Sequence, residues 1–100
     1  MSEIHEYLVQ IRIDLPPATT PERTAELLDA ERARGLALIS EGSIGRIWRI
    51  PGRQSNVGIW RAESASQLHD KITSLPLFPW MAVDVTALAT HPLEGRDDES

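Results

Sequence analysis

The residue best suited to chemistry in this sequence is Glu31, a carboxylate that falls among the apolar residues of a predicted helix. With Leu28 as the reference on a helical wheel of about 100° per residue, Gly35 and Ile39 lie beside it and Leu38 lies to one side, with Glu31 between them. Burial disfavours a charged carboxylate and raises its pKa, which makes the group useful as a general base near neutral pH. Alternatively, Glu31 lies at the edge of the apolar stripe and pairs with a nearby arginine.

Gly35 follows Glu31 by one helical turn and lies on the same face. A glycine inside a helix costs about 1 kcal/mol relative to alanine, so it calls for an explanation. Either the helix packs closely against a strand at this point, or the missing side chain leaves room for a small molecule.

Three arginines and a tryptophan lie in and just after a predicted strand, within residues 46–53. Arginine binds carboxylates through a planar fork of donors, so Arg49 and Arg53 are candidate anchors for an acidic substrate. Asn56 begins the next strand and could donate a hydrogen bond to a carbonyl oxygen, or it could be a turn residue. Strand arginines can equally pair with acids on the sheet or across an interface.

The composition excludes several kinds of site. The chain has no cysteine, which rules out disulfides, thiolate metal sites and a cysteine nucleophile. Its three histidines lack ligand spacing, so we expect no metal, and His69 is best interpreted as a packed, hydrogen-bonded residue. A formal net charge of −5 without a basic stripe argues against nucleic acid as a partner. The sequence has no signal peptide and no apolar run near the roughly 20 residues of a membrane span, so we expect a cytoplasmic protein.

The expected elements alternate in the order βαββαβ. They are a strand over 7–14, a helix over 21–40, strands over 44–50 and 57–61, a helix over 65–74 and a strand over 81–88. Thr20 and Ser64 are the predicted helix N-caps, with Gln67 completing a capping box at the second. This order predicts an α+β, ferredoxin-like domain over 1–93, with two helices on one face of a four-stranded antiparallel sheet and a disordered tail over 94–100.

A domain this small is also expected to form an oligomer. We expect it to have more large apolar surface than one subunit can bury, as indicated by Trp60, Leu77, Phe78 and Trp80. A partner subunit would cover the second face of the sheet, and His91 and Pro92 are expected to contact a neighbouring subunit.

Four segments resemble the muconolactone isomerase family. LHD at 68–70 and LPLFPWM at 75–81 resemble its LHD and LPLFPYM signature, and WRIPG at 48–52 with Asn56 resembles its WRIxG…N segment. Glu31 falls at the family's helix glutamate, and THP at 90–92 resembles its closing RHP. The resemblance extends over about residues 6–92.

The resemblance implies a cofactor-free isomerase of the β-ketoadipate pathway, built as a large homo-oligomer such as a decamer. Its small-molecule partner would be muconolactone, which it would convert to the 3-oxoadipate enol-lactone. Glu31 would be the catalytic residue that moves the proton. The substrate-binding residues would be Trp48, Arg49, Arg53, Asn56 and His69.

Some positions depart from the family pattern, and they leave the substrate open. These positions are Arg46, Arg53, Gln54, Val57 and Trp80. A related chloromuconolactone dehalogenase is one alternative. A non-catalytic oligomeric module that binds a small acid is another, and a buried rather than paired Glu31 would argue against it. A cofactor-free monooxygenase is a third, and it would need a histidine or asparagine pair lining its cleft.

Overall fold

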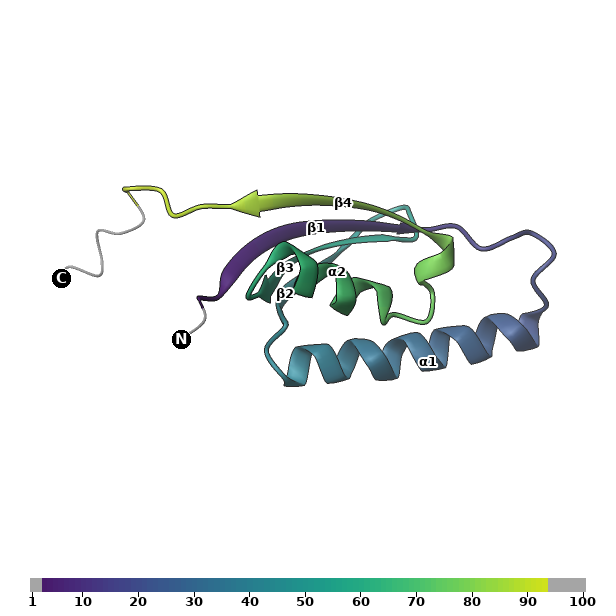
Figure 1. Cartoon of the computed structure of the whole chain (residues 1–100). Coiled ribbons are helices and arrows are strands. Elements are labelled where there is room, and N and C mark those ends of the chain that lie inside the picture. The colour runs from purple at the N-terminus through teal and green to yellow at the C-terminus, as the bar shows by residue number, and fades with distance from the viewer. Residues whose placement is uncertain (1–2, 94–100) are drawn as a thin grey trace.

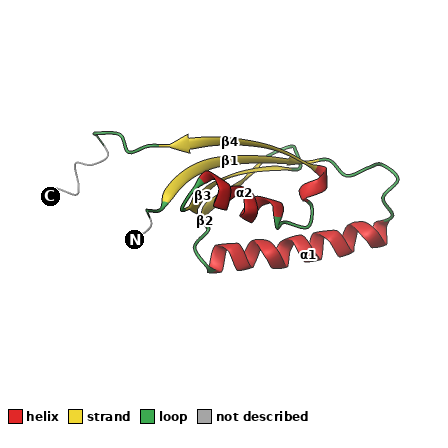
Figure 2. Cartoon of the chain, viewed as in Figure 1, coloured by secondary structure: helices red, strands yellow, loops and turns green. Residues whose placement is uncertain are grey.

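A computed structural model describes residues 3–93 of the chain, so the predicted tail over 94–100 lies outside the described residues. Figure 2 shows the elements in the predicted order, which is confirmed. They are β1 (His5–Ile13), α1 (Pro21–Ser40), β2 (Ile44–Ile50), β3 (Ser55–Ala62), α2 (Ala65–Thr73), the 3-10 turn η1 (Phe78–Trp80) and β4 (Met81–Leu88). No helix within residues 3–93 is long and apolar enough to cross a membrane.

The four strands form one antiparallel sheet in the order β2-β3-β1-β4, with both helices beneath one face (Figure 1). This is the predicted ferredoxin-like arrangement. It follows from the pattern of β1, where apolar residues alternate with polar ones. Tyr7, Val9 and Ile11 point towards the helices and are 7%, 0% and 2% exposed. They pack in one core with Trp60 of β3 and Leu38 of α1.

The helix ends are formed by the residues that the sequence predicts, with one difference. The side chain of Thr20 accepts a hydrogen bond from the Arg23 N–H, and that of Ser64 accepts one from the Gln67 N–H, each over 3.1 Å. The predicted capping box at Ser64 is altered, because the Gln67 side chain accepts from the N–H of Glu63 at 2.8 Å. The side chain therefore holds the residue before the N-cap and stabilises the entry into α2.

Candidate active site

The side of α1 that faces the rest of the subunit differs from the predicted one. The helical wheel centred the apolar stripe on Leu28, but Leu28 is exposed. Leu27 and Leu38 are 7% and 0% exposed, whereas Leu28 and Ile39 are 46% and 44% exposed. The inward side of α1 is therefore rotated towards Glu31, which is half-buried. A carboxylate thus occupies the middle of the face that α1 presents to the rest of the subunit.

Glu31 is held by the chain segment that links α2 to β4. Its Oε1 accepts a hydrogen bond from the backbone N–H of Leu77 over 2.9 Å. Burial raises the pKa of Glu31, and this N–H partly offsets the rise because it favours the ionised form. Within the described residues Glu31 makes no ion pair, so the alternative of pairing with an arginine is not observed in the subunit.

The polar contacts that hold α1 lie along its C-terminal part. Arg34 donates from Nε to the hydroxyl of Ser74 over 2.8 Å. Just beyond the helix, Lys71 donates from Nζ to the buried Ser43 over 2.5 Å, and Ser43 donates to Glu41. In the part of the chain that the structure describes, no hydrogen bond joins α1 before Glu31 to the sheet. No hydrogen bond in this part of the chain therefore fixes the N-terminal half of α1 to the strands, although Leu27 is buried there.

A cavity of about 460 Å³ lies beneath this N-terminal half, and its volume is within the range typical of small-molecule sites. It is lined by residues from α1, from the β2–β3 hairpin and from the end of β1, namely Ile13, Leu28, Arg32, Ile47, Trp48, Arg49, Gln54, Ser55 and Asn56. A second cavity of about 290 Å³ shares Ile13, Leu28 and Gln54 with it. The two hollows therefore form neighbouring parts of one open region between helix and sheet.

The polar groups of this cavity suit an anion. Arg49 and Asn56 are paired in register on neighbouring strands, so their side chains share the helix-facing side of the sheet. The Oδ1 atom of Asn56 is buried and has no hydrogen-bond partner in the described part of the chain. The described residues that line the cavity include two arginines and no acid. Two cationic groups thus face the same space, and the unpartnered Asn56 oxygen beside them is an acceptor that calls for a donor.

Two of the predicted binding residues are placed differently. Trp48 also borders the cavity, but it pairs in register with Val57, so its side chain lies on the opposite face from Arg49. There the guanidinium of Arg46 lies 4.9 Å from the centre of the indole ring. Arg53 is exposed in the turn between β2 and β3 and is not among the lining residues.

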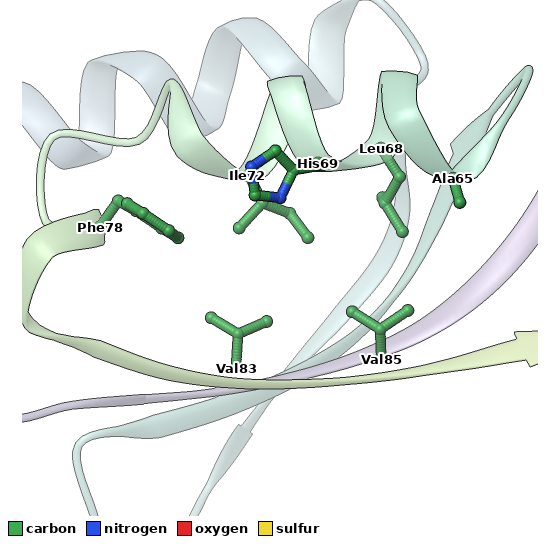
Figure 3. Close-up of a pocket in the computed structure, with 7 residues that line it drawn as sticks. All are labelled: Ala65, Leu68, His69, Ile72, Phe78, Val83 and Val85. Carbon is green, nitrogen blue, oxygen red and sulfur yellow. The ribbon is translucent and has the colours of Figure 1, made fainter.

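His69 lies at a separate groove between α2 and β4 (Figure 3). This groove has a volume of about 400 Å³, and its other lining residues are apolar. His69 is exposed, and its ring meets that of Phe78 edge-on with 6.5 Å between centroids. Within residues 3–93 it makes no hydrogen bond, so the interpretation as a packed, hydrogen-bonded histidine is wrong for the subunit. The groove lacks a cation to hold a carboxylate, unlike the cavity beneath α1.

Arg32 is a lining residue that the sequence analysis missed. On a helical wheel it lies about 40° from Leu28, on the side away from Glu31, so it looks like part of a solvated face. The signal that could have found it is its position beside the exposed apolar Leu28, at the edge of a helix that does not lie flat on the sheet.

The surroundings of Gly35 decide between the two explanations for this glycine, close packing against a strand and room for a small molecule. A Cβ atom at this position would meet no atom within 4 Å, so close packing against a strand is wrong for the subunit, and open space lies next to it. We expect Gly35→Ala to raise the free energy of unfolding by about 1 kcal/mol, because alanine favours the helix and nothing obstructs its methyl group. Denaturant unfolding of the two proteins measures this difference.

Gly58→Ala is the matched control for that measurement. A Cβ atom at Gly58 would lie 2.8 Å from the backbone oxygen of Arg46, so this variant should lose stability. Destabilisation by Gly35→Ala of similar size would show that the space beside Gly35 is occupied in the folded protein.

Among residues 3–93, no three histidine, aspartate or glutamate side chains lie close enough together to hold a metal ion. The cavity beneath α1 offers arginines and amides, and Glu31 lies nearby on α1 but is not among the described residues that line it. The arginines can bind an anion, and a carboxylate such as Glu31 can exchange a proton.

Comparisons with known proteins point to one family. The sequence profile described as muconolactone delta-isomerase matches residues 5–94. The chain is 40% identical to muconolactone delta-isomerase 2 of Acinetobacter lwoffii, over 91% of this chain and 95% of that protein. It is 38% identical to the muconolactone delta-isomerase of Acinetobacter baylyi, over 93% of this chain and 99% of that protein. The crystal structure of a muconolactone isomerase at 3.3 Å resolution superimposes with a TM-score of 0.82 and 32% identity, covering 87% of this chain and 91% of that one.

Proposed function

The chain belongs to the muconolactone delta-isomerase family, and from this premise we propose that it isomerises muconolactone in the cavity beneath α1. The observation that carries the proposal is the cavity itself, which combines two arginines with no acid among its described lining residues. Such a site suits a small lactone that bears a carboxylate. Glu31, on the same turns of α1 as Leu28 and Arg32, supplies a base beside it.

The proposed reaction moves one proton and needs no cofactor. The hydrogen on C4 of the lactone is acidic because the electron pair of the C4–H bond can delocalise through the C2–C3 double bond onto the carbonyl oxygen. The Glu31 carboxylate takes this proton, which leaves a dienolate with its charge on the carbonyl oxygen. The resulting carboxylic acid returns a proton to C2, and the double bond moves to C3–C4. One residue thus acts first as base and then as acid.

Glu31 must turn from its contact with Leu77 to reach a substrate in the cavity. Only Oε1 is engaged by the Leu77 N–H, and Oε2 has no hydrogen-bond partner in residues 3–93. The open space beside Gly35 lies on the same side of the helix. We place the reacting carbons in this space, between Glu31 and the strand residues Arg49 and Asn56.

Arg49 is the proposed anchor for the substrate's carboxylate, and Asn56 lies beside it, where its amide nitrogen rather than the buried Oδ1 would be the donor. The two residues occupy paired positions of the sheet, which is more rigid than the exposed turn that carries Arg53. Arg53 is the second choice for the anchor. Trp48 and His69 stay outside this assignment, because one side chain lies on the other face of the sheet and the other lies at the α2–β4 groove.

Incubation of the purified protein with muconolactone tests the proposal. We expect the ultraviolet absorption to change as the enol-lactone forms. A folded protein that leaves muconolactone unchanged would contradict the proposal. Conversion of a 5-chloro derivative with release of chloride, without isomerisation of muconolactone, would assign dehalogenation instead.

We further propose that the enzyme is a homo-oligomer, as large as the decamer that the family resemblance implies. The reason differs from the one suggested by sequence, since Trp60 and Leu77 are 1% and 0% exposed within one subunit. The exposed apolar residues lie elsewhere, on α1, β2 and β4, and include Leu36, Trp48, Val85 and Leu88. They need cover from another copy of the chain.

One chain has a mass of 11.1 kDa. Analytical ultracentrifugation at micromolar concentration should therefore give a single species several times heavier than this. His91 and Pro92 are exposed in the subunit, and we expect them to contact a neighbouring one. A stable monomer under these conditions would contradict the oligomer.

A further inference from the structure

Arg32 lies on the opposite wall of the cavity from Arg49. Arg32 belongs to α1, whereas Arg49 belongs to β2, and both line the same space. Within residues 3–93 neither side chain makes an ion pair or a hydrogen bond, and both are exposed. In the same range Arg12 and Arg53 are unpaired as well, but they do not line this cavity. The cavity therefore presents two uncompensated cations from two different elements.

Two separate cations suit a ligand with negative charge at two ends. The lactone of the proposed reaction carries its carboxymethyl group on C4 and its carbonyl group on C1, and these two carbons flank the ring oxygen. Substituents at such positions of a five-membered ring point away from each other. The carboxylate is charged throughout, but the carbonyl oxygen becomes charged only when the C4 proton is removed.

Resting on the proposed function, we propose that Arg32 is a catalytic residue that binds the oxygen on which the dienolate charge develops. Arg49 and Asn56 share the sheet wall and hold the carboxylate end, so the other end of the ring faces the helix wall. There Arg32 is the charged residue among the described lining groups. Donors aimed at a developing oxyanion stabilise the transition state more than the ground state.

The position of Arg32 in α1 couples it to the base. Glu31 and Arg32 are adjacent in sequence, and adjacent residues of a helix point about 100° apart. The two side chains can therefore reach the ring from one helix without pairing with each other. Movement of α1 would carry the base and the oxyanion donor together relative to the carboxylate anchor.

The kinetic test separates this role from that of a second anchor. We expect Arg32→Ala to lower kcat by about 10²–10³-fold with little change in KM, the usual effect of removing an oxyanion donor. Arg32→Lys keeps a cation and should recover part of the lost rate. Arg23→Ala, in the first turn of the same helix and paired with Glu26, is the matched control and should behave as the unaltered protein. A rise in KM with unchanged kcat would overturn the proposal.

A binding measurement tests the same contact without turnover. The probe is 4-hydroxy-3-nitrophenylacetate, which carries a carboxylate and an ionisable phenol at opposite ends and changes colour when the phenol ionises. We expect binding to the unaltered protein to lower the pKa of the phenol, and we expect this shift to be lost in Arg32→Ala but kept in Arg23→Ala. An equal shift in Arg32→Ala would overturn the proposal. If the protein does not isomerise muconolactone but the shift depends on Arg32, the proposed function fails while the oxyanion site stands.

Discussion

Glu31→Gln should abolish turnover of muconolactone while leaving the fold intact. Glutamine keeps the shape of the side chain and can still accept the hydrogen bond from the Leu77 N–H, but it cannot take a proton. Loss of a general base typically lowers the rate by about 10²–10⁴-fold. Steady-state kinetics give the loss in kcat, and circular dichroism reports the fold.

Asp29→Asn is the matched control for this variant. Asp29 lies two residues earlier on α1, is exposed, and loses the same charge on substitution. Near-normal kcat in Asp29→Asn together with a large loss in Glu31→Gln would assign the effect to the position of the carboxylate. Near-normal kcat in Glu31→Gln would mean that Glu31 is structural and that another group moves the proton.

The pH dependence of both activity and stability should follow from the raised pKa of Glu31. Activity should fall on the acid side with an apparent pKa above the ~4.3 of a free glutamate, because the base must be ionised. The stability of the fold should change with pH in the opposite direction. A carboxyl group whose pKa is raised by folding favours the folded state below its ordinary pKa, and this contribution disappears as pH rises through the raised value. Glu31→Gln should therefore unfold no more readily than the unaltered protein at neutral pH.

Arg49→Ala should raise KM for muconolactone by about 10- to 100-fold, the loss expected for a hydrogen bond between charged groups. The contact with the carboxylate is present in both the ground state and the transition state, so kcat should fall much less. Both arginines are exposed, but Arg49 lines the cavity in register with Asn56, whereas Arg53 lies in the turn and does not line it. Arg53→Ala should accordingly have the smaller effect on KM.

The comparison of these two variants decides the anchor. A large rise in KM for Arg53→Ala with none for Arg49→Ala would transfer the role to the turn. Equal losses in kcat and in kcat/KM for Arg49→Ala, with KM unchanged, would place Arg49 at the reacting carbons instead. Arg23→Ala again supplies a control of equal charge on a part of the molecule outside the cavity.

The sequence by itself determined the elements and their order. Thr20, Pro21 and Ser64 mark helix starts, Gly42 has the positive φ of 88° expected after a helix end, and the alternation in β1 identifies the buried face. These signals are local, because caps and periodic patterns depend on neighbours a few residues away. The same local motifs were enough to identify the family, since runs such as LPLFPWM at 75–81 can be compared without coordinates.

Sequence also singled out Glu31, but the tertiary structure decided what surrounds it. The Leu77 N–H that binds its carboxylate is 46 residues away, so no pattern in α1 could predict it. The same holds for the rotation of α1, which exposes Leu28 although a helical wheel places it at the centre of the apolar stripe. A wheel gives the angles between side chains and leaves the direction of the protein's interior open.

The grouping of the binding residues was likewise a matter of tertiary structure. Arg49 and Asn56 come together because the β2–β3 register pairs them, while Trp48, one residue earlier, lies on the other face of the sheet. His69 belongs to the LHD motif at 68–70 that resembles the family signature, yet α2 places it at a different groove. Arg32 lines the cavity although a helical wheel places it on the side of α1 away from Glu31. Which groups share one cavity depends on strand register and on the distance between helix and sheet, and both are set by contacts between residues far apart in the chain.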